Sequence, residues 1–318
     1  MKSLVTGGAG FIGSNLVDAL IERGDEVLVL DDLSTGREEN LAGAIASGAR
    51  LVRCDIADGD AVRSAIGEFG PDAVFHLAAQ ADVRKAVADP AFDARVNVLG
   101  TVNVLEATRL AGGAPLVFAA TGGAVYGEGE GVDLPFPEST PPAPETAYGA
   151  SKLAGEIYLG LFRRLHGMPS LALRFGNVYG PRQDPHGEAG VVAIFCGRLL
   201  AGEAPTIYGD GRQTRDYVFV GDAVRAILAA GEALAAGGAP AGPLNIGSGR
   251  ETSVLDLLDS LLPLAGSDLE PTFAEARSGE VRRVSLDPSA AGEALGWSAR
   301  TPLAEGLRAT FESVQLPG

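Results

Sequence analysis

The sequence is poor in the residues that build metal and redox sites. Among its 318 residues there are two cysteines, Cys54 and Cys196, and three histidines. The cysteines have neither a metal-ligand nor a redox-motif spacing, and no histidine, cysteine or carboxylate cluster has metal-ligand spacing. We therefore expect no metal site, and reduced thiols of the kind found in the cytoplasm.

Long apolar runs and positive charge are also scarce. No apolar run reaches the ~18 residues of a membrane-spanning helix, and the N-terminus begins directly with a strand pattern, which predicts no signal peptide. The chain has 25 lysines and arginines against 41 aspartates and glutamates, a net charge of −16. This balance disfavours nucleic acid and anionic membranes as partners. An anionic small ligand would need locally placed arginines.

Glycine is abundant, and it marks the first turn of the chain. Apolar residues over 3–30 predict a buried strand, a helix that begins after the turn Gly7–Gly13, and a second strand. This is the βαβ unit of a dinucleotide site. Gly8 and Gly10 are expected to let a pyrophosphate approach the backbone, and Gly13 to let the helix pack close to the strand.

Two acidic residues, Asp31 and Asp32, end the second predicted strand. There the Asp31 carboxylate can accept hydrogen bonds from the ribose hydroxyls of an adenosine, whereas a 2′-phosphate would meet two like charges. The pattern therefore favours NAD over NADP. The alternative, a tight turn with a packing helix and no ligand, is disfavoured because strand, turn, helix, strand and acid occur together.

The first half of the chain alternates strictly between strand and helix patterns. Further strands are predicted at 50–54, 72–76, 115–120 and 170–175, and helices at 58–69, 92–110 and 146–166. This order predicts a Rossmann-type, doubly wound parallel sheet over residues 1–175, with ligands bound beyond the carboxyl ends of its strands. In the helix 92–110 we expect Val96, Leu99, Val102 and Leu105 to face inward.

Beyond Gly176 the alternation loosens. Helices are predicted at 190–201, 221–236 and 253–264, and strands at 206–208, 217–220 and 244–246. Residues 176–318 are therefore predicted to form a smaller mixed α/β domain for the substrate, with some segments returning to pack on the first domain. The Ala/Gly/Pro-rich stretch Ala229–Pro243 predicts a surface loop.

Tyr148 and Lys152 are four residues apart, so they share one face of a predicted helix. A tyrosine with a pKa near ~10 is a poor base, but a nearby ammonium group and a cationic nicotinamide would stabilise its phenolate. An isolated pair of this spacing is usually a packed tyrosine and a solvated lysine. After a dinucleotide-binding pattern and a threonine at the end of the fifth strand, an acid–base pair is favoured.

Several segments together resemble a known family. They are Thr6–Gly13, Asp31, Asp55, His76–Ala79, Asn97, Thr121, Tyr148 with Lys152, and Arg174–Gly180. They resemble the extended short-chain dehydrogenase/reductase family over essentially the whole chain, and within it the nucleotide-sugar 4-epimerases of the UDP-glucose 4-epimerase type.

The resemblance implies a bound NAD, a UDP-sugar substrate and a homodimer. The implied cofactor site is formed by Gly7, Gly10, Phe11, Ile12, Gly13, Asp31, Asp32, Asp55, Ile56, Leu77, Ala78, Ala79, Asn97, Tyr148 and Lys152. The implied substrate site is formed by Thr121, Gly122, Tyr148, Asn177, Arg215, Arg277 and Glu280. Arginine suits the diphosphate because its planar guanidinium makes bidentate contacts.

The implied catalytic residues are Tyr148, Lys152 and Thr121. Tyr148 would take the proton of the sugar 4-hydroxyl while hydride leaves C4, and would return it after the keto sugar has turned over. The usual serine or threonine position of the family is Gly122 here, one residue after Thr121. Either Thr121 serves through a changed turn, or Tyr148 works with less help.

Other functions stay open at this stage. One is 4-epimerisation of UDP-N-acetylglucosamine or UDP-glucuronate. Another is a 4,6-dehydratase or decarboxylase, although such relatives carry acidic residues where this chain has Gly122 and Gly123. A third is a non-catalytic NAD-binding protein, which the Tyr148–Lys152 pair disfavours. Val284 is expected to border the sugar site and to leave room for an N-acetyl group.

Overall fold

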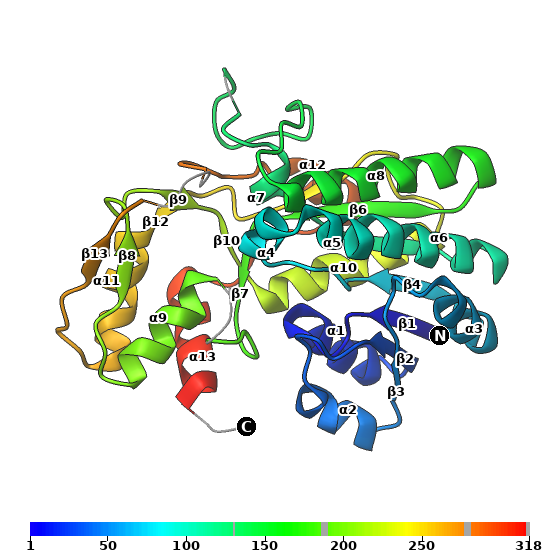
Figure 1. Ribbon diagram of the computed structural model, residues 1–318, viewed down its shortest axis with the longest axis horizontal. Helices are drawn as coiled ribbons and strands as arrows, with labels where there is room; N and C mark the ends of the chain where they lie inside the picture. The colour runs from blue at the N-terminus through cyan, green and yellow to red at the C-terminus, as the bar shows by residue number, and fades with distance from the viewer. Residues whose placement is uncertain (130, 186–189, 277–280, 316–318) are drawn as a thin grey trace.

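The computed structural model describes residues 1–129, 131–185, 190–276 and 281–315. Its centre is a seven-stranded sheet in which all neighbouring strands are parallel (Figure 1). In spatial order the strands are β11 (Leu244–Ile246), β6 (Ser170–Phe175), β5 (Leu116–Thr121), β4 (Ala73–His76), β1 (Lys2–Thr6), β2 (Glu26–Asp31) and β3 (Arg50–Arg53). The strand order reverses between β1 and β4, which confirms the predicted doubly wound sheet.

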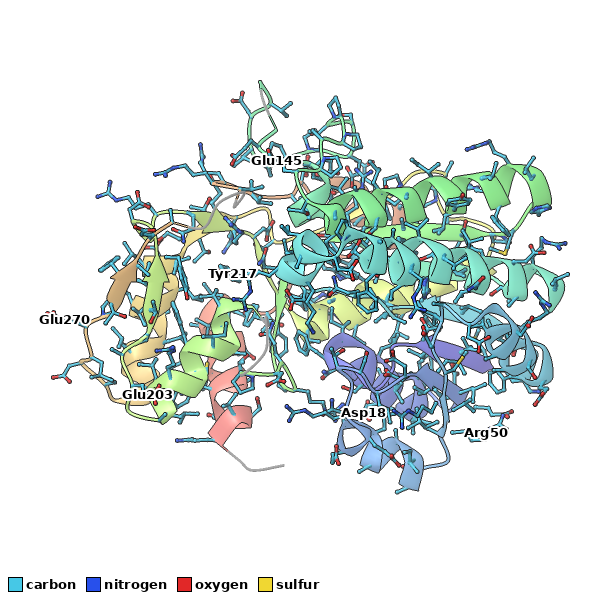
Figure 2. The ribbon with its side chains drawn as sticks, in the orientation of Figure 1. Asp18, Arg50, Glu145, Glu203, Tyr217 and Glu270 are labelled. Carbon is cyan, nitrogen blue, oxygen red and sulfur yellow. The ribbon has the colours of Figure 1, made fainter. Side chains whose placement is uncertain are left out.

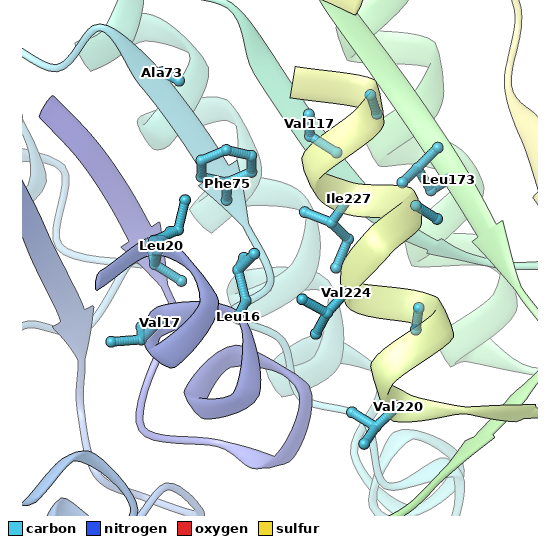
Figure 3. Packing of buried hydrophobic residues seen from close by; sticks show 14 of the residues in the cluster. Leu16, Val17, Leu20, Ala73, Phe75, Val117, Leu173, Val220, Val224 and Ile227 are labelled. Atoms are coloured by element: carbon cyan, nitrogen blue, oxygen red, sulfur yellow. The ribbon is translucent and has the colours of Figure 1, made fainter. Parts of the chain in front are cut away.

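Helices cover both faces of this sheet. On one face lie α1 (Phe11–Glu22), α2 (Ala42–Ala46), α10 (Val220–Ala235) and α12 (Ser289–Leu295). On the other lie α3 (Gly59–Phe69), α6 (Gly100–Leu110) and α8 (Ala147–His166). Successive residues of a strand point to opposite faces, so Val5 joins the first core and Leu4 the second. Figure 3 shows Leu16 of α1 and Ile227 of α10 close to Phe75 in the first core.

The predicted helix 92–110 is interrupted. It consists of α5 (Pro90–Ala94), a π-helical turn η2 (Arg95–Leu99) and α6. A π-helical turn inserts one residue and rotates the following side chains by roughly 100° relative to a continuous α-helix. The prediction that Leu99 faces inward is therefore wrong: Leu99 is 47% exposed, whereas Leu105 is fully buried.

Several short elements carry no strong periodic pattern and were not predicted. Three examples in the sheet region are η1 (Glu38–Leu41), α4 (Val83–Ala88) and α7 (Gly122–Val125). Each is six residues or shorter, and a helical period needs more than one turn to be visible in a sequence.

The second part of the chain, seen beside the large sheet in Figure 1, has its own apolar core. Its elements are β7 (Asn177–Tyr179), α9 (Val191–Leu200), β8 (Thr206–Tyr208), β9 (Thr214–Arg215), β10 (Tyr217–Phe219), β12 (Thr252–Ser253), α11 (Val254–Ala265), β13 (Thr272–Ala274) and α13 (Leu303–Gln315). Helices α9, α11 and α13 pack together, and three two-stranded sheets pair β10 with β7, β12 with β9, and β13 with β8.

Some later segments return to the large sheet. Strand β11 pairs with β6, and α10 crosses the sheet so closely that a Cβ on Gly231 would lie 3.0 Å from the Phe75 ring. The loop predicted for Ala229–Pro243 is wrong in its first part, because α10 continues to Ala235 and buries Leu234. Small residues suit a helix that lies this close to a sheet, so their abundance there does not indicate a loop.

Both cysteine thiols, of Cys54 and Cys196, are free and buried. The cytoplasmic location inferred from them stays a prediction. No helix among the described residues is both long enough and apolar enough to cross a membrane, and those residues hold no group of three or more histidine, cysteine or carboxylate side chains placed to bind a metal ion.

Candidate active site

The carboxyl ends of the parallel strands bring the predicted cofactor residues to one edge of the sheet (Figure 1). Thr6 ends β1, Asp31 ends β2 and Thr121 ends β5. Asp55 and Ile56 follow β3, while Leu77, Ala78 and Ala79 follow β4. Residues up to 115 positions apart in the sequence therefore meet at the edge where doubly wound sheets bind ligands.

The glycines of the first turn have different structural reasons. Gly7 has a φ of +71°, and a Cβ on it would lie 2.6 Å from the Ala78 nitrogen. A Cβ on Gly13 would clash with the carbonyl oxygen of Gly7, so Gly13 does allow the helix to approach the turn. Gly8 was predicted to leave room for the pyrophosphate, and this prediction is wrong. A Cβ added to Gly8 would point into the core and meet the Val29 side chain. A Cβ on Gly10 would meet only the Gly7 carbonyl oxygen, at 3.3 Å, and the role predicted for Gly10 at the pyrophosphate stays a prediction.

The N-terminus of α1 fits the phosphates of a dinucleotide. Gly10 is its N-cap, no side chain caps the first turn, and that turn has no acidic residue. The first N–H groups of a helix have no partner within the helix, and its positive dipole end favours an anion. The backbone of Phe11, Ile12 and Gly13 can therefore hold the pyrophosphate of NAD.

Asp31 also shapes the loop in which it lies. Its carboxylate accepts hydrogen bonds from the backbone nitrogens of Ala9 and Leu33, both at 2.9 Å. Burial raises its pKa, against these two hydrogen bonds. Asp32 accepts from the backbone nitrogen and hydroxyl of Ser34 (2.9 and 2.7 Å). A carboxylate has about four acceptor positions, so both residues can still bind a ribose, and this role stays a prediction.

Asn97 binds protein groups on every side. Its Oδ1 accepts from the Gln80 nitrogen (2.8 Å), and its Nδ2 lies within hydrogen-bond distance of Gln80 O, Asp93 Oδ1 and Ser151 Oγ (2.9, 3.0 and 3.1 Å). It lies in the π-helical turn η2, which turns it towards the loop after β4 and towards α8. The contacts show that Asn97 holds the loop after β4 in place, and its predicted role in cofactor binding stays a prediction.

Tyr148 and Lys152 lie in the first turns of α8, beside β5. Thr146 caps the helix by accepting from the Gly149 nitrogen (3.1 Å). Lys152 is 3% exposed, donates from Nζ to the Ala119 carbonyl (2.9 Å), and lies 4.8 Å from the centre of the Phe118 ring. The helix thus anchors the ammonium group on β5, two residues before Thr121.

The protein groups around Tyr148 act against its ionisation. Burial and the negative charge of Asp93 raise the pKa of Tyr148 to about 12, and the lowered pKa predicted with a bound nicotinamide stays a prediction. Burial lowers the pKa of Lys152 to about 8, although the carboxylates of Asp93 and Glu156 oppose this shift. The protein alone therefore holds Tyr148 as a neutral phenol, and a bound cation beside it would be needed to favour the phenolate.

The turn after β5 decides which side chain can reach the site. A Cβ on Gly122 would lie 2.5 Å from the Leu286 side chain, so position 122 faces the core. A Cβ on Gly123 would lie 4.0 Å from Thr121 Oγ1 and 3.6 Å from Asn177 Oδ1. Thr121 and Asn177 are therefore neighbours, and the hydroxyl available on this side of the site is that of Thr121.

The residues predicted for the substrate phosphates are only partly described. Arg215 lies in β9, where its Nη1 donates to the Thr214 carbonyl (2.8 Å). Arg277 and Glu280 lie outside the described residues. Asp216, which follows Arg215 in the chain, is fully buried and accepts hydrogen bonds from Ser248, Gly249 and Leu286.

The role predicted for Val284 is wrong. Its side chain is 1% exposed and packs with Tyr126, Phe136 and Leu286. The backbone of β9 lies beside it, because the Val284 nitrogen donates to the Thr214 carbonyl (3.3 Å). Val284 is a core residue, and a tyrosine in its place would overpack this cluster.

The two parts of the chain meet next to the sheet edge that is formed by the carboxyl ends of the parallel strands. Arg182, after β7, pairs with Asp18 of α1 at 2.6 Å, and Asn15 Nδ2 donates to the Pro181 carbonyl (3.2 Å). Figure 2 shows Asp18 on α1 and Tyr217 at the junction between the parts. These contacts place the segment after β7 beside α1, which follows the carboxyl end of β1.

Two polar groups near the site were not predicted. One is Asp93, which is buried beside Asn97. The other is the buried pair of Arg174 and Glu156, joined by two hydrogen bonds of 2.9 and 2.7 Å. Arg174 belongs to the motif that carries the family resemblance, but no sequence spacing links it with Glu156.

A Rossmann-type sheet with a glycine turn at its switch point and a Tyr–Lys pair beside it defines a dinucleotide-binding enzyme. Residues 3–247 match the family described as "NAD dependent epimerase/dehydratase family", and the chain belongs to that family.

The chain is similar to several characterised relatives. It is 49% identical over 316 residues to a UDP-glucose 4-epimerase of Mycolicibacterium smegmatis, covering 98% of both chains. A structure of UDP-glucose 4-epimerase from Thermotoga maritima with UDP-glucose superimposes with a TM-score of 0.94, at 45% identity over 99% of each chain. The Thermus thermophilus UDP-glucose 4-epimerase complex with NAD gives a TM-score of 0.90 at 44% identity, again over 99% of each chain.

Proposed function

We propose that this protein is a nucleotide-sugar 4-epimerase that interconverts UDP-glucose and UDP-galactose with bound NAD. The observation that carries the proposal is the placement of Tyr148 and Lys152 at the strand ends, next to the glycine turn and to the neighbouring Thr121 and Asn177. The similarity to UDP-glucose 4-epimerases over nearly the whole chain supports it.

Each residue has a distinct task in this reaction. NAD supplies a hydride acceptor that takes hydride from C4 of the sugar and returns it. Tyr148 exchanges the proton of the 4-hydroxyl, and Lys152 presents a positive charge on the same helix face. Thr121 offers a hydroxyl near the sugar. The second part of the chain, with Asn177 and Arg215, is proposed to hold the UDP portion.

The turn after β5 favours epimerisation over dehydration. A dehydratase must also protonate a leaving hydroxyl, and related dehydratases are expected to carry acidic residues directly after the threonine. Here the two residues are Gly122, which faces Leu286, and Gly123, which faces Thr121 and Asn177. Neither glycine has a side chain that could donate a proton to a leaving hydroxyl. The 4-keto sugar is therefore expected to be reduced again.

The assay uses the purified protein with UDP-galactose and no added reductant or cofactor. The proposal predicts UDP-glucose as the product, at an equilibrium reached from either sugar. UDP-N-acetylglucosamine and UDP-glucuronate serve as competing substrates, and preferential turnover of either would move the proposal to that sugar. Accumulation of a 4-keto-6-deoxy sugar would indicate a dehydratase, and the absence of any turnover would contradict an enzymatic role.

We expect NAD, and not NADP, to be released when the purified protein is denatured. The glycine turn and the free helix end bind the pyrophosphate, whereas Asp31 and Asp32 would repel a 2′-phosphate. Chromatography of the denatured supernatant identifies the nucleotide. NADP without NAD in the supernatant would contradict the assignment of Asp31 and Asp32.

We further infer that the enzyme is a homodimer formed through the outer surface of α4, α5, η2 and α8. These helices adjoin one another, and each exposes an apolar side chain: Val87, Phe92, Leu99 and Ile157. An exposed apolar surface of this kind is typical of a contact between proteins. The wild type is expected to have twice the monomer mass by light scattering. Val87→Glu with Ile157→Glu should yield a monomer, whereas Phe273→Glu, at an exposed residue of β13, should leave the mass unchanged.

A further inference from the structure

We propose that Asp93 is a positioning residue that sets the pH range in which Tyr148 exchanges its proton. The inference rests on the proposed function for its consequence in catalysis, but its physical basis is the placement of one buried carboxylate. Asp93 lies in α5, which packs against α8. It is not among the residues that the sequence motifs single out.

The carboxylate of Asp93 is only half satisfied by the protein. The residue is 1% exposed, and its Oδ1 accepts from Gln80 Nε2 (3.1 Å) and Asn97 Nδ2 (3.0 Å). Its Oδ2 is buried and has no hydrogen-bond partner in the described part of the chain. Leaving a buried polar atom without a partner typically costs about 1–3 kcal/mol, and more for a charged one. Such a group calls for a reason other than stability.

A short chain of hydrogen bonds connects Asp93 to the catalytic helix. Asn97 Nδ2 donates to Ser151 Oγ (3.1 Å), and Ser151 Oγ donates to the Tyr148 carbonyl (3.0 Å). Ser151 directly precedes Lys152. The carboxylate is thus held at a fixed place beside the backbone that carries both Tyr148 and Lys152.

Among the residues that the structure describes, no other carboxylate adjoins Tyr148 and Lys152 without a cationic partner of its own. The other charged and titratable residues on α8 and on the elements packed against α5 and α8 are Asp82, Arg84 and Lys85 of the α4 segment, Arg95 of η2, Glu106 and Arg109 of α6, Arg174 of β6, and Glu156, Tyr158, Arg163, Arg164 and His166 of α8 itself. Glu156 is paired with Arg174, and Glu106 with Arg109. His76, which contacts Thr6 and Thr101, is uncharged near neutral pH because burial lowers its pKa to about 3.

The charge of Asp93 acts on both members of the pair. It raises the pKa of Tyr148 and opposes the fall in the pKa of Lys152 that burial causes. A negative charge at this place favours the neutral phenol and the ammonium group. Asp93 therefore balances a cationic cofactor, so that Tyr148 can return its proton as readily as it takes it.

The test compares Asp93→Asn with Asp89→Asn in the NAD-containing enzyme. Asparagine can keep the Oδ1 contacts of Asp93 and removes its charge, with an amide NH2 in place of the buried Oδ2. Asp89 caps the same helix through the Phe92 nitrogen (2.9 Å) and is exposed, and asparagine is an equally good cap. Without the Asp93 charge, Tyr148 ionises at lower pH and Lys152 loses its proton at lower pH. Both limbs of the pH profile of kcat/KM should move about one unit lower in Asp93→Asn and stay in place in Asp89→Asn.

A titration of Tyr148 separates this inference from the proposed function. The chain has six tyrosines, and the Tyr148 carbon resonance of ¹³Cζ-labelled protein is identified by its loss in Tyr148→Phe. Its midpoint should fall by about one unit in Asp93→Asn whether or not the protein epimerises UDP-glucose. An unchanged midpoint, or reduced activity with unchanged pH limbs, would show that Asp93 has only a structural role and would overturn the inference.

Discussion

Tyr148→Phe is expected to reduce kcat by a factor of about 10²–10⁴, the usual contribution of a general acid–base. Phenylalanine keeps the ring but has no hydroxyl to exchange with the sugar. No hydrogen bond of the Tyr148 hydroxyl supports the fold in the described part of the chain, whereas Lys152 holds its own contact with Ala119. The variant should therefore keep its NAD and its thermal stability while losing turnover.

Tyr158→Phe is the matched control, because Tyr158 lies in the same helix and packs against the core on that side. It should keep near-normal kcat. Thr121→Ala is expected to lower kcat less than Tyr148→Phe, since Thr121 assists only by a hydrogen bond. If Tyr148→Phe retained turnover close to that of the wild type, another group would have to be the base. A larger loss of kcat in Thr121→Ala than in Tyr148→Phe would indicate that Thr121, and not Tyr148, is the main acid–base residue.

The sheet and its cofactor edge could be predicted from the sequence because their signals are local. A parallel strand buried on both faces is a continuous apolar run, and β6 was predicted with its exact bounds, Ser170–Phe175. The glycine turn and the two aspartates lie within one βαβ unit, where spacing along the chain fixes spacing in space. The strands β9 and β12 have two residues each, too few to show a period.

The failures arise where a side chain's direction depends on distant contacts. Val284 follows a family motif closely, yet its neighbours Tyr126 and Phe136 come from more than 140 residues earlier and enclose it. The π-helical turn directs Leu99 towards the surface and lets Asn97 contact the loop after β4. Asp93 is similar: a lone aspartate in a predicted helix is normally exposed, and only the packing of α5 on α8 buries it.

Glu156→Gln is expected to destabilise the protein by about 3–5 kcal/mol, because it leaves the Arg174 charge buried without its counter-charge. The side chains of the pair are 5% and 9% exposed. Although burial opposes its charge, the hydrogen bonds and charge of Glu156 raise the pKa of Arg174 above its ordinary value. Arg174 also donates to the Tyr126 hydroxyl (2.8 Å), which in turn donates to Asn245 Oδ1 (2.8 Å).

Urea unfolding followed by circular dichroism, at one fixed NAD concentration, measures this loss, since bound NAD shifts the equilibrium by mass action. Glu26→Gln is the control: Glu26 pairs with Arg50, both side chains are more than half exposed, and such pairs contribute about 0–1 kcal/mol. A second variant, Glu156→Leu with Arg174→Met, removes both charges and should recover much of the loss, because no buried charge then lacks a partner.

If Glu156→Gln unfolded at the urea concentration of the wild type, the pair would not be buried in solution as the structure has it. If the double variant were less stable than Glu156→Gln, the loss would come from packing around Tyr126, and the charge would not be its cause.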